Sequence, residues 1–148
     1  MAGRRLPLIP VDKLSTEQRK VYDSIRGGPR AKLANFSGAA PGPLGGPFNM
    51  MLRSPDIGNI VQSLGGEIRF NSSLPAKLNE FAIIVTARYW TSQYEWHAHR
   101  ILALKAGLDP STAEDLAMGL RPARLLADES IVYDFCTELH RDKAVSDA

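Results

Sequence analysis

Apolar residues recur every three or four positions along most of this chain, which is the spacing of an α-helix. No segment shows the alternation of apolar and polar residues that is typical of a strand. Helix-starting residues such as Ser54-Pro55-Asp56 and helix-ending residues such as Gly107 mark the boundaries. Together these signals predict an all-α fold, with helices over about residues 15–27, 54–70, 75–89, 92–106, 109–119 and 127–139.

Glycines and prolines gather in residues 34–47, which predicts a long loop followed by a short turn at residues 48–52. We therefore expect residues 1–44 to form an N-terminal arm, one helix and this loop, and residues 45–148 to form a helical domain. Within the predicted helix over residues 54–70, Gly65-Gly66 predicts that another backbone approaches closely.

Composition and charge narrow the class of protein. The chain lacks an apolar run of the ~20 residues that span a bilayer, and its apolar N-terminal patch is too short and proline-rich for a signal peptide. We therefore expect a cytoplasmic protein without a membrane partner. Residues 1–32 hold eight Lys or Arg against three acids, yet no pattern of a nucleic-acid-binding module accompanies them, so we expect a solvated surface and no nucleic-acid partner.

The chain has a single cysteine, Cys136, which excludes an internal disulfide and any Cys-x-x-Cys motif. Cys136 lies on the apolar stripe of the last predicted helix with Ile131, Val132, Phe135 and Leu139. We therefore predict a packed, unreactive thiol.

Glu95 and His99 are the first candidates for chemistry. They are four positions apart, so on a helix their side chains are neighbours. Leu102 and Ala106 continue the same face, and titratable groups on a face that turns apolar are costly unless they are paired or functional. A carboxylate beside an imidazole fixes its tautomer, which suits acid–base chemistry. The alternative is an ordinary pair on a helix surface, as is common at this spacing.

Glu80 lies on the preceding predicted helix, and a tight turn at Trp90-Thr91 would make the two helices antiparallel. Glu80 precedes the turn by about as many residues as His99 follows it, so we expect the two at similar height. We predict Glu80, Glu95 and His99 as catalytic residues. His97 is roughly 200° around the helix from His99, and a helical zinc motif needs histidines four apart, so we expect no metal.

Aromatic and basic residues near this group are candidates for substrate binding. Aromatic residues are more often core or interface than ligand contacts, but Tyr94 and Trp96 flank Glu95 directly. A substrate carboxylate would pair with an arginine, for which Arg53 and Arg88 are the candidates, although Arg88 could equally be a plain surface charge. We predict these four residues as substrate-binding.

Residues 74–99 resemble the core of the carboxymuconolactone decarboxylase family, and residues 103–108 and 46–55 fit it too. The resemblance covers about residues 45–120 and includes Glu80, Tyr94-Glu95-Trp96 and His99 at the family's spacing. It implies an alkyl hydroperoxidase D-like helical fold that oligomerises through its helices. In the alkyl hydroperoxidase branch a Cys-x-x-Cys pair stands where this chain has Ser92 and Glu95, so we expect no thiol peroxidase.

In the decarboxylase branch the substrate is a carboxylated lactone whose own unsaturation accepts electrons, so the resemblance implies no cofactor. We expect a lyase in which His99 donates the proton, Glu95 is its partner and Glu80 is a second acid–base group. The alternative is a non-catalytic helical oligomer that binds a small ligand or a partner protein. We expect a homo-oligomer, whether dimer, trimer or hexamer. The resemblance implies several more helices after this point, and Ser146-Asp147 looks like the cap of a further helix, so we expect a truncated or naturally shortened chain whose last helix packs on another subunit.

Overall fold

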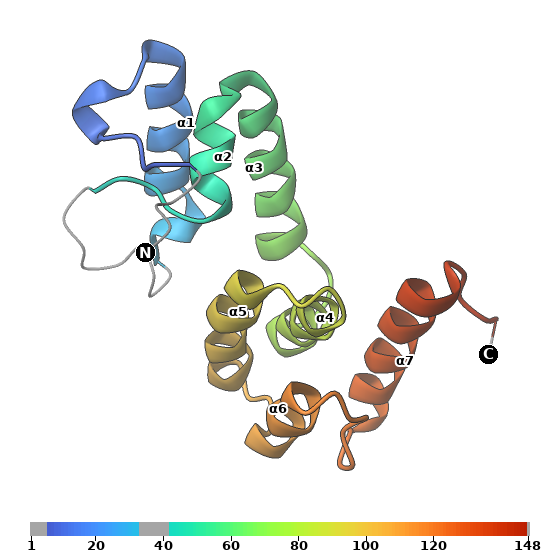
Figure 1. Ribbon diagram of the computed structural model, residues 1–148. Helices are drawn as coiled ribbons and strands as arrows, with labels where there is room; N and C mark the ends of the chain where they lie inside the picture. Colours follow the sequence, from blue (N-terminus) through green and yellow to red (C-terminus); the bar gives the residue numbers. More distant parts are fainter. Residues whose placement is uncertain (1–5, 33–41, 148) are drawn as a thin grey trace. The chain divides into compact units, whose positions relative to one another are not determined.

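The computed structural model describes residues 6–32 and 42–147. The basic residues Arg4 and Arg5, and residues 34–41 of the predicted loop, lie outside the described residues. The described ranges contain helices and no strand, so the prediction of an all-helical chain is confirmed (Figure 1). Two short 3-10 helices, Val11–Lys13 and Pro29–Lys32, accompany α1 (Thr16–Gly27), α2 (Pro47–Arg53), α3 (Pro55–Phe70), α4 (Ala76–Tyr89), α5 (Gln93–Lys105), α6 (Pro110–Ala117) and α7 (Ala127–Asp142).

Local signals in the sequence account for the helix ends. Ser15 and Gln18 form a reciprocal capping box at the start of α1, and the Asp109 side chain accepts the amide of Ser111 at the start of α6. Proline occupies the first turn of α2, α3 and α6, where its missing N–H costs nothing. Gly107 has φ +98° directly after α5, as its role as a helix stop predicts. Residues 48–52, predicted as a turn, belong to α2.

The described residues form two compact units, one ending at Ser72 and the other beginning at Ser73. In the first unit, α1, α2 and α3 surround a core that consists of Val21, Tyr22, Ile25, Leu44 and Leu52. The expected division of the chain at residue 44 stays a prediction.

Close packing in the first unit depends on Gly58. A Cβ at Gly58 would lie 2.1 Å from the carbonyl oxygen of Met51, so α3 passes the α2 backbone where only glycine fits. The pair Gly65-Gly66 serves a different purpose from the predicted one. No backbone atom of another segment lies close to either glycine. The nearest neighbour is the buried guanidinium of Arg30, which would lie 3.2 Å from a Cβ at Gly65 and 3.4 Å from a Cβ at Gly66. Arg30 donates to Gln62 Oε1 over 3.3 Å, so the glycines make room for a side chain.

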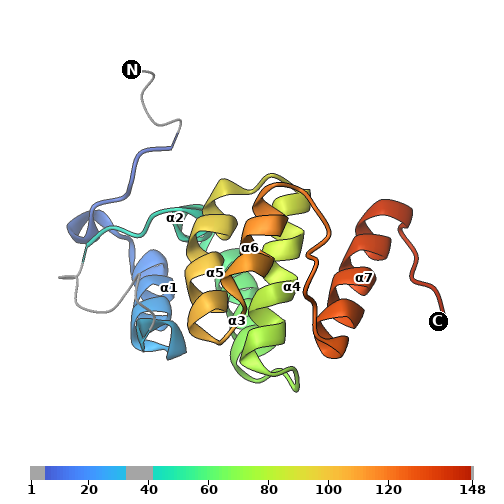
Figure 2. The ribbon, with the colours of Figure 1, turned by 90° about the horizontal axis from the view of Figure 1, so that it is seen from below.

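In the second unit, α4 packs against α5, α6 and α7, and Figure 2 shows α4 beside α5 and α6. The core contains Phe81, Ile84, Val85, Ala103, Leu108, Ala113, Leu116 and Cys136. The start of α4 is tied to the start of α7 by an ion pair of 2.6 Å between Lys77 Nζ and buried Glu129 Oε1. The prediction that the Cys136 thiol is packed is confirmed, and burial raises its pKa, which disfavours the reactive thiolate.

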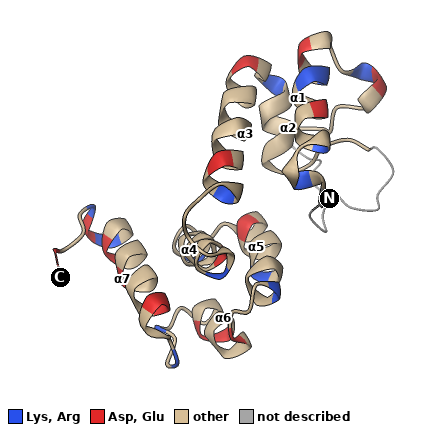
Figure 3. Ribbon diagram, turned by 180° about the vertical axis from the view of Figure 1, so that it is seen from behind, with Lys and Arg blue, Asp and Glu red and all other residues tan. Residues whose placement is uncertain are grey.

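Two apolar stripes that the sequence places on single helix faces lie at the surface. On α3 the stripe consists of Ile57, Ile60, Val61, Leu64 and Ile68. Figure 3 shows that the charged residues of α3 lie near its two ends, which leaves its middle uncharged. On α7 the exposed residues are Ile131, Phe135 and Leu139, whereas Val132 is partly buried against the core. None of the described helices is both long and apolar enough to cross a membrane.

Substituting Gly58 with alanine tests the contact between α2 and α3. The added methyl group would meet the Met51 carbonyl, so we expect Gly58→Ala to lower the free energy of unfolding by about 1–3 kcal/mol. The matched control is Gly27→Ala in α1, where a Cβ would meet nothing within 4 Å. We expect this substitution to raise the free energy of unfolding by about 0.4–1 kcal/mol. Urea unfolding followed by circular dichroism measures both. Equal effects of the two substitutions would contradict the close approach.

Candidate active site between α4 and α5

A tight turn makes α4 and α5 antiparallel. Trp90, Thr91 and Ser92 connect the helices, and the Ser92 amide donates to the Ala87 carbonyl oxygen over 2.9 Å. Thr91 has φ +51°, a left-handed conformation that is costly for a β-branched residue. The turn keeps this conformation, and the packing of the two helices brings Glu80 on α4 opposite His99 on α5.

Glu80 and His99 form a buried hydrogen bond across this packing. His99 Nδ1 lies 2.6 Å from Glu80 Oε2. Only 8% of Glu80 and 9% of His99 is exposed, so the hydrogen bond is largely shielded from water. A hydrogen bond from a carboxylate to one ring nitrogen fixes both the tautomer and the orientation of an imidazole. The second ring nitrogen, Nε2, is thereby aimed along α5.

Glu95 meets that second nitrogen from the first turn of α5. Its Oε2 lies 3.2 Å from His99 Nε2, and 39% of its side chain is exposed. Ser92 and Glu95 have the spacing of a capping box, yet the Ser92 side chain makes no cap hydrogen bond. The positive end of the helix dipole stabilises a carboxylate at this position. The three side chains therefore form a line from the interior, Glu80, through His99 to the more exposed Glu95.

The two contacts set how many protons this line holds. Each carboxylate–nitrogen hydrogen bond needs one proton, so both are formed together only when the three groups share two protons and carry a net charge of −1. Removing one proton leaves a lone pair of the ring facing a carboxylate oxygen. The line can therefore give up a proton at its Glu95 end and take one back, which is the property required of a general acid–base group.

A mostly apolar cavity of about 420 Å³ opens beside Glu95. Its walls are formed by Ala82, Ile83, Thr86, Ala87, Trp90, Ser92 and Glu95. Glu95 is the one charged residue in this lining. Thr86 and Trp90 are lining residues that were not predicted from the sequence. The signal for them was the spacing of Ala82, Thr86 and Trp90 at four-residue intervals, which marks one face of α4.

The residues of α5 that were predicted to bind substrate, Tyr94 and Trp96, are not in the lining of this cavity. Trp96 is partly buried against the core of the second unit and lines a neighbouring hollow, which shares Ala87 and Ser92 with the cavity. Tyr94 is 44% exposed, and desolvation of the covered part of its ring, followed by the charge of the neighbouring Glu95 carboxylate, raises the pKa of its phenol. Tyr94 therefore keeps its proton at neutral pH and can donate a hydrogen bond. His97 is exposed on α5.

Neither of the two predicted arginines lines the cavity beside Glu95. Arg53 ends α2 in the first unit, where its guanidinium donates to the carbonyl oxygen of Pro7. Arg88 donates through Nε to the carbonyl oxygens of Leu116 and Ala117, over 3.1 Å and 3.3 Å, at the end of α6. The Arg88 side chain therefore turns toward α6 and away from Glu95.

His140, at the end of α7, makes two specific contacts. Its Nε2 lies 3.0 Å from Thr86 Oγ1, and its ring stacks on Tyr89 with centroids 4.9 Å apart.

No trio of His, Cys, Asp or Glu within residues 6–32 and 42–147 is arranged to hold a metal ion.

Comparison with known proteins gave no match to this chain among family models, curated proteins or solved structures.

Substituting the two glutamates separately tests the described line of side chains. Glu80→Gln removes a charge from a buried hydrogen bond, so we expect it to lower the free energy of unfolding by about 1.5–3 kcal/mol. Glu95→Gln removes a partly exposed charge, for which we expect a loss of under about 1 kcal/mol. Urea unfolding curves of both variants measure the difference. A larger decrease in the free energy of unfolding for Glu95→Gln than for Glu80→Gln would contradict the finding that Glu80 is the more buried carboxylate.

Proposed function

We propose that this protein is a cofactor-independent lyase or isomerase that transfers protons to and from a small carboxylated lactone or a related acid. The observation that carries this proposal is the double role of Glu95. Its carboxylate lines the cavity and also contacts His99 Nε2, and the opposite ring nitrogen is hydrogen-bonded to buried Glu80. A proton can therefore pass between a bound molecule and the interior without free water.

The geometry suggests roles that differ from those expected from the sequence. Glu95 borders the cavity and His99 is not part of its lining, so we assign the proton transfer to substrate to Glu95. His99 relays the proton, and Glu80 holds the ring and balances its charge. When Glu95 is protonated, the remaining negative charge lies at Glu80, so an anionic substrate meets no charge of the same sign in the cavity wall.

The lining of the cavity suits a small ring. Ala82, Ile83 and Trp90 offer apolar contacts, and the hydroxyls of Thr86 and Ser92 offer hydrogen bonds to ring or carbonyl oxygens. In decarboxylation of an unsaturated lactone, the bond to the carboxylate carbon breaks and its electron pair enters the conjugated system. Carbon dioxide leaves, and Glu95 then delivers a proton to carbon.

The resemblance to the carboxymuconolactone decarboxylase family supports the same proposal. Ser92 and Glu95, at the two positions where the alkyl hydroperoxidase branch has thiols, both line this cavity. Cys136 belongs to the buried core and lines none of the cavities described here. Proton transfer, and not thiol redox chemistry, therefore matches the groups at the cavity wall.

A substrate screen tests the proposed activity. Carboxylated lactones and aromatic-pathway acids are incubated with the wild type, His99→Ala and Glu95→Gln, and consumption is followed by NMR. We expect both substitutions to lower turnover by about 10²–10⁴-fold, which is the usual contribution of a positioned acid–base group. The matched control is His97→Ala, an exposed histidine on the same helix, which should retain activity.

The outcomes of this screen separate the two candidate functions. Consumption that continues in His99→Ala would refute the proposed role of the trio. If no compound in the screen is consumed, the chain is better explained as a non-catalytic helical oligomer that binds a small ligand or a partner protein.

The exposed stripe on α7 favours an oligomer under either function. Ile131 is 71% exposed and Phe135 is 51% exposed, and Leu139 continues the same face. Contiguous exposed apolar side chains of this kind mark interaction surfaces in folded proteins. We propose that the stripe packs against another copy of the chain.

Sedimentation velocity tests this oligomer. We expect the wild type to exceed the 16.2 kDa mass of one chain, and Phe135→Glu to shift the distribution toward the monomer. The control is Arg141→Glu, an exposed residue of α7 outside the stripe, which should leave the distribution unchanged. A wild-type monomer at high concentration would refute the proposed oligomer.

A further inference from the structure

His140, near the end of α7, lies between the cavity beside Glu95 and a second cavity. The second cavity has a volume of about 300 Å³ and is lined by residues of α4, of α7 and of the end of α6. His140 belongs to this lining, as do Arg88, Tyr89 and Tyr133. The two linings share no residue, so the cavities are separate. The His140 side chain nevertheless contacts two residues that line the cavity beside Glu95.

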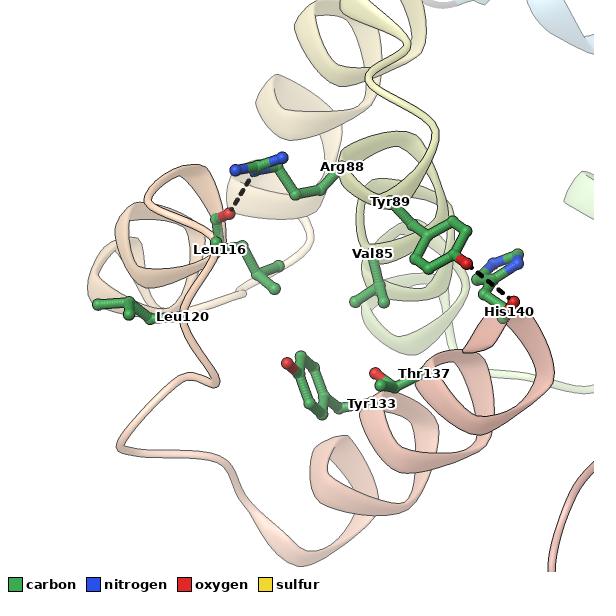
Figure 4. A pocket seen from close by; sticks show the side chains of 9 residues that line it. Val85, Arg88, Tyr89, Leu116, Leu120, Tyr133, Thr137 and His140 are labelled. Carbon is green, nitrogen blue, oxygen red and sulfur yellow. Dashed lines mark hydrogen bonds between the residues drawn. The ribbon is translucent and has the colours of Figure 1, made fainter. Parts of the chain in front are cut away.

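Three residues of α4 hold His140. Its ring stacks on Tyr89, with centroids 4.9 Å apart, and the Tyr89 hydroxyl donates to the His140 carbonyl oxygen over 3.0 Å (Figure 4). The ring also meets Trp90 edge to face, with centroids 6.1 Å apart and an interplanar angle of 88°. His140 Nε2 lies 3.0 Å from Thr86 Oγ1. Because Thr86 and Trp90 line the cavity beside Glu95, His140 supports part of that cavity wall.

The hydrogen bond to His140 determines what the Thr86 hydroxyl can offer to a ligand. A threonine within a helix commonly donates its hydroxyl to a carbonyl one turn earlier. Within the described chain the Thr86 hydroxyl makes no such bond and is paired with His140 Nε2. A hydroxyl has one proton. If Nε2 accepts that proton, none is left for a ligand, whereas if Nε2 donates, the Thr86 proton stays available.

Two observations favour a ring that donates through Nε2. His140 Nδ1 has no hydrogen-bond partner within the described residues, so no protein acceptor holds the ring proton at that nitrogen. The cavity also needs a donor beside its apolar residues, because an ionised Glu95 only accepts hydrogen bonds. A Thr86 hydroxyl that keeps its proton supplies this donor from α4.

We propose that His140 is a positioning residue for the cavity beside Glu95. Its Nε2–H donates to Thr86 Oγ1, and the Thr86 proton is thereby kept for the carbonyl oxygen of a bound lactone. This inference rests on the proposed function and extends it by naming the group that meets the carbonyl. A doubly protonated ring donates through Nε2 as well, so the direction of the bond is the same in both charge states.

The tautomer of His140 tests the direction of this hydrogen bond. NMR of the ring nitrogens of the full chain at about pH 8, where histidine side chains are ordinarily neutral, distinguishes a protonated nitrogen from a bare one. The spectrum of His140→Phe, which lacks the signals, assigns them. We expect the proton of the neutral ring at Nε2. A proton at Nδ1 would overturn the proposal, because Nε2 would then accept from Thr86.

γ-Butyrolactone is the probe for the ligand carbonyl. Titration of the full chain, followed by amide shifts in NMR, should give a saturable response at Thr86 and Trp90 with a Kd of about 1–10 mM. Tetrahydrofuran, which has the ring without the carbonyl, should bind about twofold to tenfold more weakly. Absence of a saturable response to the lactone, or equal binding of tetrahydrofuran, would also overturn the proposal.

Substitutions assign the effect to the pair. Thr86→Val removes the donor at nearly constant volume and should weaken lactone binding about twofold to tenfold. His140→Phe keeps a ring on Tyr89 but no donor, so the Thr86 hydroxyl turns to a carbonyl of its own helix and binding should weaken as much. The double variant should bind no more weakly than either single variant.

Two further variants are the controls for this series. His140→Gln retains a side-chain N–H donor and should restore lactone binding to within about twofold of the wild type. Thr137→Val makes the same change as Thr86→Val in the lining of the second cavity and should have no effect. Binding by His140→Phe that equals the wild type would refute the role of His140.

The experiment separates this inference from the proposed function. γ-Butyrolactone has no carboxylate to lose, so its binding does not depend on turnover. If no compound of the substrate screen is consumed but lactone binding depends on Thr86 and His140, only the proposed chemistry fails. If turnover depends on Glu95 but Thr86→Val and His140→Phe bind and react as the wild type does, only the role of His140 fails. Circular dichroism of each variant confirms that the helices are intact.

Discussion

The contact of the buried Glu80 carboxylate with His99 is the interaction on which the rest of the second unit depends. Burying a carboxylate and an imidazole is costly unless each satisfies the other, and a length of 2.6 Å shows that they do. This contact requires α4 and α5 to be antiparallel at one relative height. The tight turn through Thr91 sets that height, and the strained conformation of Thr91 is tolerated because the packed helices determine it.

The position of α4 explains why one short helix serves two cavities. Glu80 and Ile84 face α5 or the core, Ala82, Thr86 and Trp90 face the cavity beside Glu95, and Val85, Arg88 and Tyr89 face the cavity toward α6 and α7. A helix that contacts three neighbours has little free surface. The grooves that remain between its neighbours become cavities, and the residues facing each groove decide its chemistry.

The two cavities differ because their charges differ. The cavity beside Glu95 has one acidic group that is linked to a buried imidazole, so a proton can be exchanged there. The other cavity has one guanidinium, that of Arg88, and no carboxylate in its lining. Arg88, predicted from the sequence to meet a substrate carboxylate, belongs to this second cavity. The structure thus places Arg88 and Glu95 in the linings of different cavities.

Much of this protein could be predicted from its sequence, and the reason is that local signals were sufficient. Helix periodicity, caps such as Ser15 and Asp109 and the stop at Gly107 act over a few residues, so the helices and their ends followed from the pattern. The pairing of Glu95 with His99 followed from a spacing of four. The approach of Glu80 required only the assumption of a tight turn between two helices.

Only the tertiary structure decided what depends on residues distant along the chain. Periodicity places Ile57 and Phe135 on apolar faces, but it cannot say whether another helix covers those faces, and in this structure both residues are exposed. A glycine pair predicts close approach without naming the neighbour, which for Gly65-Gly66 is the Arg30 side chain. Cavities have no local signal, because each is bounded by helices that meet only in the folded chain. The sequence therefore determined the helices and the Glu95–His99 pair, whereas the packing decided which residues line a cavity.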